Sequence, residues 1–145
     1  MSNYKISIES IYPDEKIETR KIKDIAKTVL SEEQVSHAEI NIVFVDDNYI
    51  IKLNKQFLNK DMTTDVMSFN LEDEPDTHLE GEVYVNIDQI KRQADDYQVT
   101  FREELYRIVI HGLLHLVGFS DQAIKEKKIM TKKEDHYLAI FENIL

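Results

Sequence analysis

Two histidines and an aspartate, closely spaced towards the C-terminus, form the array in this sequence that is best suited to chemistry. His111 and His115 are four residues apart in an apolar, helix-periodic segment, so both imidazoles lie on one helix face. Gly118 permits the chain to leave the helix and turn back, and Asp121 follows three residues later. Two nitrogens and one oxygen leave a fourth tetrahedral position open to water, which is typical of catalytic zinc. We predict one metal site here, with Zn²⁺ as the expected ion, although other divalent ions suit the same donors.

An ion held in this way activates water for attack on a phosphoryl or carbonyl centre. The zinc-peptidase signature HExxH has a glutamate base after the first histidine, but Gly112 stands there, so peptide hydrolysis by that route is disfavoured. The simpler interpretation is a buried helix that happens to contain two histidines, with Asp121 capping the next helix. The HxxxH pair alone favours this simpler interpretation, whereas the glycine and the aspartate together favour the metal site. The other histidines have no histidine four residues further on: His37, His78 and His136.

Composition limits both the fold and the ligands. The chain has 145 residues, 42% of them hydrophobic and 32% charged, which predicts one folded domain over residues 1–145. It contains no cysteine, so imidazole and carboxylate must hold any metal. No secretory signal or membrane span is predicted, and a cytoplasmic protein is expected.

The net charge of −10 works against a broad nucleic-acid surface, and DNA binding is not expected. A local basic strip remains open, because much of the positive charge is concentrated in two groups. Solvated helix faces are the simpler interpretation of each group taken alone. The groups are Lys52, Lys55 and Lys60, and then Lys125, Lys127, Lys128, Lys132 and Lys133.

Hydrophobic periodicity predicts the elements that must position the site. Alternating or continuous apolar residues predict strands over 4–8, 38–45, 65–70 and 81–87, and an acidic segment predicts a surface loop over 71–80. Helical spacing predicts helices over 20–30, 47–58, 88–97, 101–118 and 123–142.

Several helix starts carry capping residues. Asp46 and Asp47 offer N-cap chemistry for the second predicted helix. Asp88 is the expected cap of the third, and Thr100 with Glu103 forms a capping box at the start of the fourth. The strands 65–70 and 81–87 follow each other closely enough for antiparallel pairing. The predicted fold is α+β, a small mixed sheet of about four strands packed with helices. Its metal site lies at the C-terminal end of the central helix.

Several motifs together resemble the YbeY family of endoribonucleases. They are HGLLHLVGFSD at 111–121 with Met130 and Glu134 downstream, GEVYVN at 81–86, TTDVMSF at 63–69 and LNKQF at 53–57. The resemblance implies a zinc-dependent single-strand endoribonuclease of the bacterial cytoplasm. It implies a role in 16S rRNA 3′-end maturation and ribosome quality control, by attack of metal-activated water on a phosphodiester. The implied partners are ribosomal RNA and the small ribosomal subunit.

The resemblance also implies roles for particular residues. His111 and His115 match the first two metal ligands, and they are the catalytic residues through the bound metal. Asp121 falls at the third ligand position, which is usually histidine, and a one-residue shift would put Gln122 there instead. The family tends to have an arginine after LNxxF, where this chain has Leu58.

Four further residues are predicted to bind substrate: Lys60, Thr64, Asp65 and Ser68. A turn capped by Thr64 and Asp65 before a buried strand is an equal alternative. Met130 is expected in the core, and Glu134 is expected either in solvent or behind the site, orienting a histidine. The alternative function is a non-catalytic ribosome assembly factor with a structural metal.

Overall fold

Along the described residues the chain forms two strand–helix pairs, then two successive strands and three successive helices. The computed structural model describes residues 3–12, 17–71 and 78–141. Within them the elements are β1 (Asn3–Ser10), α1 (Thr19–Glu32), β2 (His37–Val45), α2 (Asp47–Leu58), β3 (Val66–Asn70), β4 (His78–Asn86), α3 (Ile87–Tyr97), α4 (Phe101–Leu116) and α5 (Ile124–Ile140). These elements confirm the predicted α+β class.

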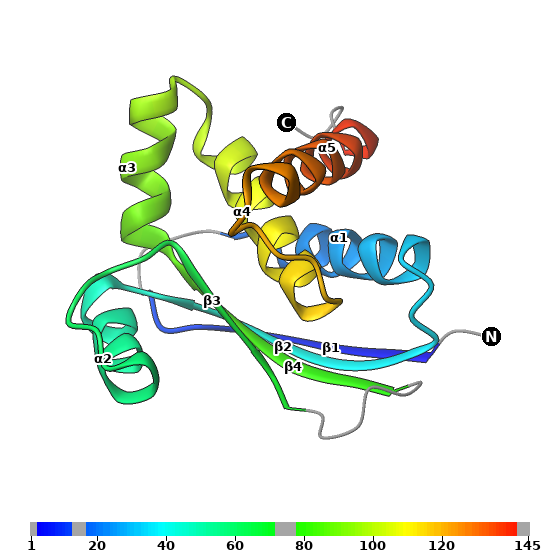
Figure 1. The fold of residues 1–145 in the computed structure, drawn as a ribbon, viewed down its shortest axis with the longest axis horizontal. Coiled ribbons are helices and arrows are strands. Elements are labelled where there is room, and N and C mark those ends of the chain that lie inside the picture. The colour runs from blue at the N-terminus through cyan, green and yellow to red at the C-terminus, as the bar shows by residue number, and fades with distance from the viewer. Residues whose placement is uncertain (1–2, 13–16, 72–77, 142–145) are drawn as a thin grey trace.

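The strands form one mixed sheet in the order β1-β2-β4-β3. β2 pairs in parallel with both β1 and β4, whereas β3 and β4 pair antiparallel, as their short connection predicts. Helices α1 and α4 cover one face of the sheet, α5 packs over α4, and α2 lies beyond the other face (Figure 1). The sheet is therefore enclosed on both sides where α2 and α4 face each other across it.

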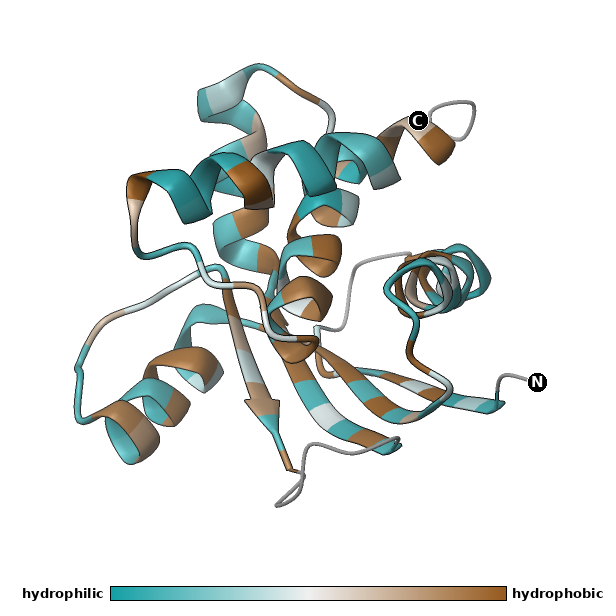
Figure 2. Cartoon of the chain, turned by 45° about the vertical axis from the view of Figure 1, so that its right-hand side comes forward, coloured by the Kyte–Doolittle hydropathy of each residue, from teal (hydrophilic) through white to brown (hydrophobic). Residues whose placement is uncertain are grey.

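The burial of β2 explains its change of pattern along the chain. Ile40, Ile42 and Phe44 point into the main core beneath α1 and α4. Val43 and Val45 belong to a smaller cluster with Ile50 of α2. Figure 2 shows that the strands under the helices are largely apolar. The second half of the strand has helices on both faces, so its sequence is a continuous apolar run rather than an alternation.

Strand β4 begins at His78, three residues before the predicted start at Gly81. The sequence predicts a loop through residue 80 because 71–80 is acidic, contains Pro75 and lacks periodicity, but residues 78–80 extend the parallel ladder opposite residues 37–39. Pairing with a distant strand therefore overrides the local sequence signal. Residues 72–77 of the predicted loop lie outside the described residues.

The predicted cap of α3 was wrong. Asn86, not Asp88, caps this helix, since its side-chain oxygen accepts from the Asp88 N–H at 3.1 Å. The Asp88 carboxylate accepts instead from the Tyr12 hydroxyl at 2.6 Å and from the Asp47 N–H at 3.0 Å. Asp88 thus ties the start of α3 to the start of α2.

Two other caps are confirmed. Asp46 accepts from the Tyr49 N–H at the start of α2, and Thr100 accepts from the Glu103 N–H at the start of α4. Along the residues that the structure describes, no helix is both long and apolar enough to cross a membrane.

Candidate metal centre

The C-terminus of α4 makes the turn that the site requires. Gly118 has a φ of +108°, in the left-handed region that favours glycine. Its N–H donates to the His115 carbonyl, and the Phe119 N–H donates to the Leu114 carbonyl. This paired arrangement is a Schellman motif, which ends the helix and reverses the chain. The reversal brings Asp121 back to the helix face that carries the two histidines.

Three ligand atoms converge at this turn. The Nε2 atoms of His111 and His115 are 3.0 Å apart, and Asp121 Oδ2 lies 3.2 Å from the first and 3.7 Å from the second. Bonds of 2.0–2.2 Å in a tetrahedral zinc site place ligand atoms roughly 3.3–3.5 Å apart. The spacing and the donor types therefore fit one small divalent cation.

The sequence leaves open whether Asp121 or Gln122 is the third donor. The two side chains lie in different surroundings in the structure. Asp121 belongs to a group of three side chains whose donor atoms all lie within 4.8 Å of one another. Gln122 is exposed at the rim of the adjoining cleft. The Asp121 carboxylate is therefore placed to complete a donor set with the two imidazoles.

Glu134 supports the site from behind. Its side chain is 9% exposed, and its Oε2 lies 2.6 Å from His111 Nδ1. Arg107 donates to the other carboxylate oxygen of Glu134 at 3.0 Å and to Asp135 at 2.8 Å. A hydrogen bond from His111 Nδ1 to this carboxylate directs the Nε2 lone pair towards the ligand cluster. Of the two positions expected for Glu134, the structure confirms the one behind a histidine.

The local field at His111 favours positive charge. Burial alone would lower the pKa of His111, but the hydrogen bond to Glu134 and the charges of Glu134, Asp121 and Asp65 outweigh it and raise the pKa. The same negative surroundings favour a bound cation.

Gly112 lies where α4 meets the sheet. A Cβ on this residue would approach Val83 Cγ1 to 2.6 Å and Val66 Cγ2 to 3.0 Å. The Ser68 hydroxyl donates to the Gly112 carbonyl at 2.8 Å. The position after the first histidine therefore faces packed strands and not the ligand cluster, so a base there would point the wrong way.

The ligand cluster opens into a cleft of about 750 Å³ between the end of α4, strand β3 and the end of α2. All four predicted substrate-binding residues line it together with the three ligand candidates: Lys60, Thr64, Asp65 and Ser68 beside His111, His115 and Asp121. Met130 is buried in the core, as expected. The structure thus brings every predicted site residue to one cleft.

A family model described as "Endoribonuclease YbeY" matches residues 6–142 of this sequence. The chain belongs to the YbeY family. It is 40% identical over 139 residues to Endoribonuclease YbeY of Flavobacterium psychrophilum, covering 96% of this chain and 94% of that protein. It is 41% identical over 110 residues to Endoribonuclease YbeY of Karelsulcia muelleri, covering 76% and 77%. The solution structure of TM1509 from Thermotoga maritima matches with a TM-score of 0.65 and 27% identity, covering 95% of this chain and 92% of that one.

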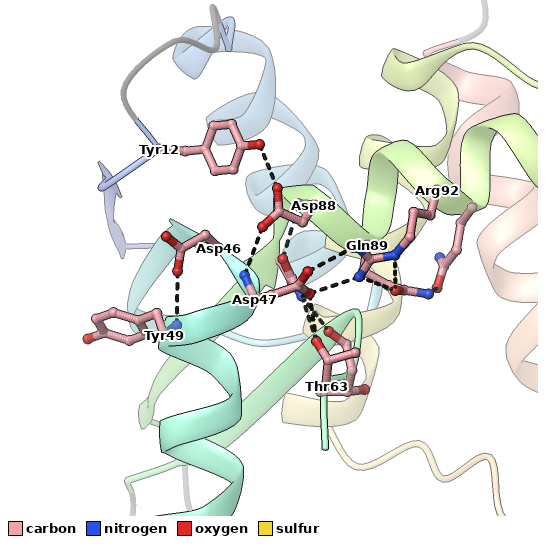
Figure 3. A network of polar contacts seen from close by, with 11 residues as sticks. Tyr12, Asp46, Asp47, Tyr49, Thr63, Asp88, Gln89 and Arg92 are labelled. Carbon is pink, nitrogen blue, oxygen red and sulfur yellow. Dashed lines mark hydrogen bonds and ion pairs between the residues drawn. The ribbon is translucent and has the colours of Figure 1, made fainter. Parts of the chain in front are cut away.

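In this YbeY chain a polar network supports residues 63–65, which line the cleft (Figure 3). The buried Asn86 side chain donates to Asp47 at 2.7 Å, to the Thr63 hydroxyl at 2.9 Å and to the Thr64 carbonyl at 3.1 Å. Its backbone N–H donates to the Asp65 carbonyl at 2.8 Å. Asn86 therefore contacts each of residues 63–65, two of which were predicted to bind substrate, and Thr63 also donates to Asp47 at 2.8 Å.

Arg92 completes this network. Its two terminal nitrogens donate to the two carboxylate oxygens of Asp47 at 2.8 and 2.9 Å. The hydrogen bond from Arg92, helped by those from Asn86 and Thr63, lowers the pKa of Asp47 well below its usual range despite some burial.

The sequence analysis did not identify Arg107, which supports the metal centre, or Asn86, which supports residues 63–65. Arg107 lies four residues before His111 on the same helix face, so helical spacing could have revealed it. Asn86 carries no such signal, because its partners come from α2 and from the segment before β3.

The edge of the cleft at the end of α2 is apolar. Leu58 lines it with 56% of its surface exposed, at the place where the family resemblance implies an arginine. The exposed Met62 lies beside it in the cleft lining.

Proposed function

We propose that residues 1–145 form one metal-dependent hydrolase domain that cleaves single-stranded RNA. We propose 16S rRNA 3′-end maturation and ribosome quality control in the cytoplasm as its role, with the small ribosomal subunit as partner. The observation that carries the proposal is the convergence of His111 Nε2, His115 Nε2 and Asp121 Oδ2 on one point in an open cleft. The relatives' name, Endoribonuclease YbeY, supplies RNA as the substrate class.

Each side chain has a defined part in this proposal. His111, His115 and Asp121 hold the ion, for which we propose Zn²⁺ because nitrogen and oxygen donors suit it. When bound, such an ion polarises a phosphoryl oxygen and lowers the pKa of a water molecule. Glu134 and Arg107 keep His111 Nε2 aimed at the ion, which preserves the geometry needed for reaction.

The opposite wall is proposed to position the RNA. The Lys60 ammonium is the cation among the described residues that line the cleft, and it suits a phosphate oxygen. Thr64 and Ser68 add hydroxyl groups, and Asp65 adds a carboxylate that accepts from ribose or base donors.

Elemental analysis and RNA cleavage by the same samples test this proposal. Wild type and His37→Ala, a matched histidine variant on β2, should hold about one metal ion per chain and cleave a precursor of the 16S rRNA 3′ end. His115→Ala should lose both properties, and EDTA should abolish wild-type cleavage. Equal cleavage by wild type and His115→Ala would show a contaminating nuclease and contradict the proposal.

The third ligand has its own comparison. Asp121→Ala should lose the metal, whereas Gln122→Ala should keep it, because the Asp121 carboxylate oxygen lies 3.2 and 3.7 Å from the two imidazole nitrogens. The reverse result would assign the ligand role to Gln122.

A non-catalytic ribosome assembly factor is the second candidate. The apolar Leu58 at the cleft edge and the acidic Asp65 inside it favour this function, since neither attracts phosphate. It predicts that His115→Ala loses thermal stability and ribosome association together, while neither protein cleaves RNA.

A further inference from the structure

Helix α5 carries a basic strip on its outer face. Its residues are spaced so that they lie on one side of the helix, and all are exposed. They border a shallow hollow of about 400 Å³. The α5 strip consists of Ile124, Lys127, Lys128, Thr131 and Lys132.

The charge of this strip contrasts with that of the whole chain. Residues 124–133 contain five lysines and one glutamate, whereas the chain carries a net charge of −10. Lys133 is paired with Glu33 at 2.8 Å. Within the described residues, the three strip lysines form no ion pair with a carboxylate. Their charge is therefore available to an external anion.

The strip begins at the rim of the cleft. Gln122 lines the cleft, and Ile124 follows two residues later, so their Cα atoms are at most ~7 Å apart. From Ile124 to Lys132 the helix rises by about 12 Å. Figure 2 shows the first turn of α5 directly after the loop that leaves α4. The strip therefore starts two residues beyond the cleft lining.

The cleft itself is poorly equipped to hold a polyanion. Among the described residues that line it, Lys60 is the one lysine or arginine, and the Asp65 carboxylate opposes it, while Asp121 is proposed to bind the metal ion. Binding of a nucleic-acid backbone depends on lysine and arginine that replace its counterions. The needed positive charge must therefore come largely from outside the cleft.

We propose that the α5 strip binds the phosphate backbone of the RNA segment that flanks the cleaved bond. This inference rests on the proposed function and adds a second contact surface to it. An anionic lipid surface fits the strip less well, because a membrane-bound helix buries an apolar face. The apolar face of α5 is already packed in the core through Met130, Tyr137 and Leu138.

A matched pair of double variants tests the strip. Lys128→Gln/Lys132→Gln removes two strip charges, and Lys23→Gln/Lys27→Gln removes two exposed charges at the same spacing on α1. Binding of EDTA-treated proteins to a fluorescent oligouridine is measured at several salt concentrations. At 0.1 M salt the α5 variant should bind about 10- to 30-fold more weakly, with a salt slope smaller by about 1.4, because each lost phosphate contact contributes about 0.7. The α1 variant should bind within about twofold of wild type.

Cleavage by the metal-loaded proteins gives a second measurement. The α5 variant should have a raised KM and an unchanged kcat, since the strip does not touch the reacting atoms. If both double variants bound oligouridine equally weakly, or if neither bound it more weakly than wild type, the proposal that the α5 strip binds RNA would be overturned. Loss of binding to phosphatidylserine vesicles while oligouridine binding is retained would also overturn it.

The two proposals fail in different ways. Strip-dependent RNA binding by a wild-type protein that cleaves no RNA would overturn the proposed function and support the strip. If wild type cleaved RNA in a metal-dependent way and both double variants bound RNA equally well, the proposed function would be supported and the RNA-binding role of the α5 strip would be overturned. Matched thermal melting curves confirm that both double variants are folded.

Discussion

The two walls of the cleft are both polar, but their hydrogen bonds differ in kind. In the wall formed by the Asn86 network, Asp47 Oδ1 accepts from Thr63, Asn86 and Arg92 at 2.7–2.8 Å. In the metal wall, a neutral His111 that donates from Nδ1 to Glu134 leaves Nε2 without a hydrogen. This nitrogen then faces a second imidazole and a carboxylate oxygen.

This difference in hydrogen bonding separates a structural network from a metal-binding site. A network in which each acceptor has a donor gains stability and rigidity from inside the protein. A cluster in which acceptors face one another lacks positive charge, so a proton or a metal ion completes it. The first wall should therefore matter most for folding, and the second for metal affinity.

The largest expected effect comes from removing the centre of the satisfied network. Asn86→Ala leaves several buried partners unsatisfied and should lower the free energy of unfolding by about 2–4 kcal/mol. Zinc affinity of the folded protein should stay within about threefold of wild type. Urea unfolding and calorimetric zinc titration measure the two quantities. Asn48→Ala, an exposed position on α2, is the matched control, and a large loss of zinc affinity in Asn86→Ala would erase the distinction between the walls.

A smaller effect is expected behind the metal wall. Glu134→Gln should weaken zinc binding about 10- to 100-fold, because the amide no longer fixes His111 through a charged acceptor. Asp135→Asn is the control, since Asp135 shares Arg107 but does not contact His111. Competition with a fluorescent zinc chelator measures both. Equal losses in the two variants would mean that Arg107, and not the contact with His111, governs affinity.

The smallest expected effect is the loss, at low pH, of the contribution that the Asp47 carboxylate makes to the free energy of unfolding. Its folded-state pKa is lowered, so its contribution to stability is present above the unfolded pKa of ~3.9 and is lost as pH falls below that value. After allowance for the half-exposed Arg92, this contribution is about 1–2 kcal/mol. The stability difference between wild type and Asp47→Asn should therefore shrink from pH 5 to pH 2 in urea unfolding. A constant difference would show that the carboxylate charge does not hold this wall.

Much of the metal wall could be predicted from sequence because its parts are local. His111, His115, Gly118 and Asp121 lie within eleven residues, so helix geometry and one turn place them together. The contact of Glu134 with His111 depends on how α5 packs against α4, and only the family resemblance drew attention to that residue.

The network wall was harder to foresee. Asp88 has the sequence position of a helix cap, but it bonds Tyr12 and the start of α2, and Asn86 takes the capping role. The early start of β4 at His78 has the same origin, since its pairing with β2 is set by the sheet. Contacts between segments far apart in sequence decided each of these features.

Gly112 restricts how this scaffold could be redesigned. Any side chain at that position would enter the space held by Val83 and Val66 and push the histidine-bearing helix off the sheet. Converting the site into a protease by copying a glutamate into the helix would thus damage the ligand geometry that it was meant to exploit. New chemistry would have to be introduced from β3 or from the end of α2, on the far side of the cleft.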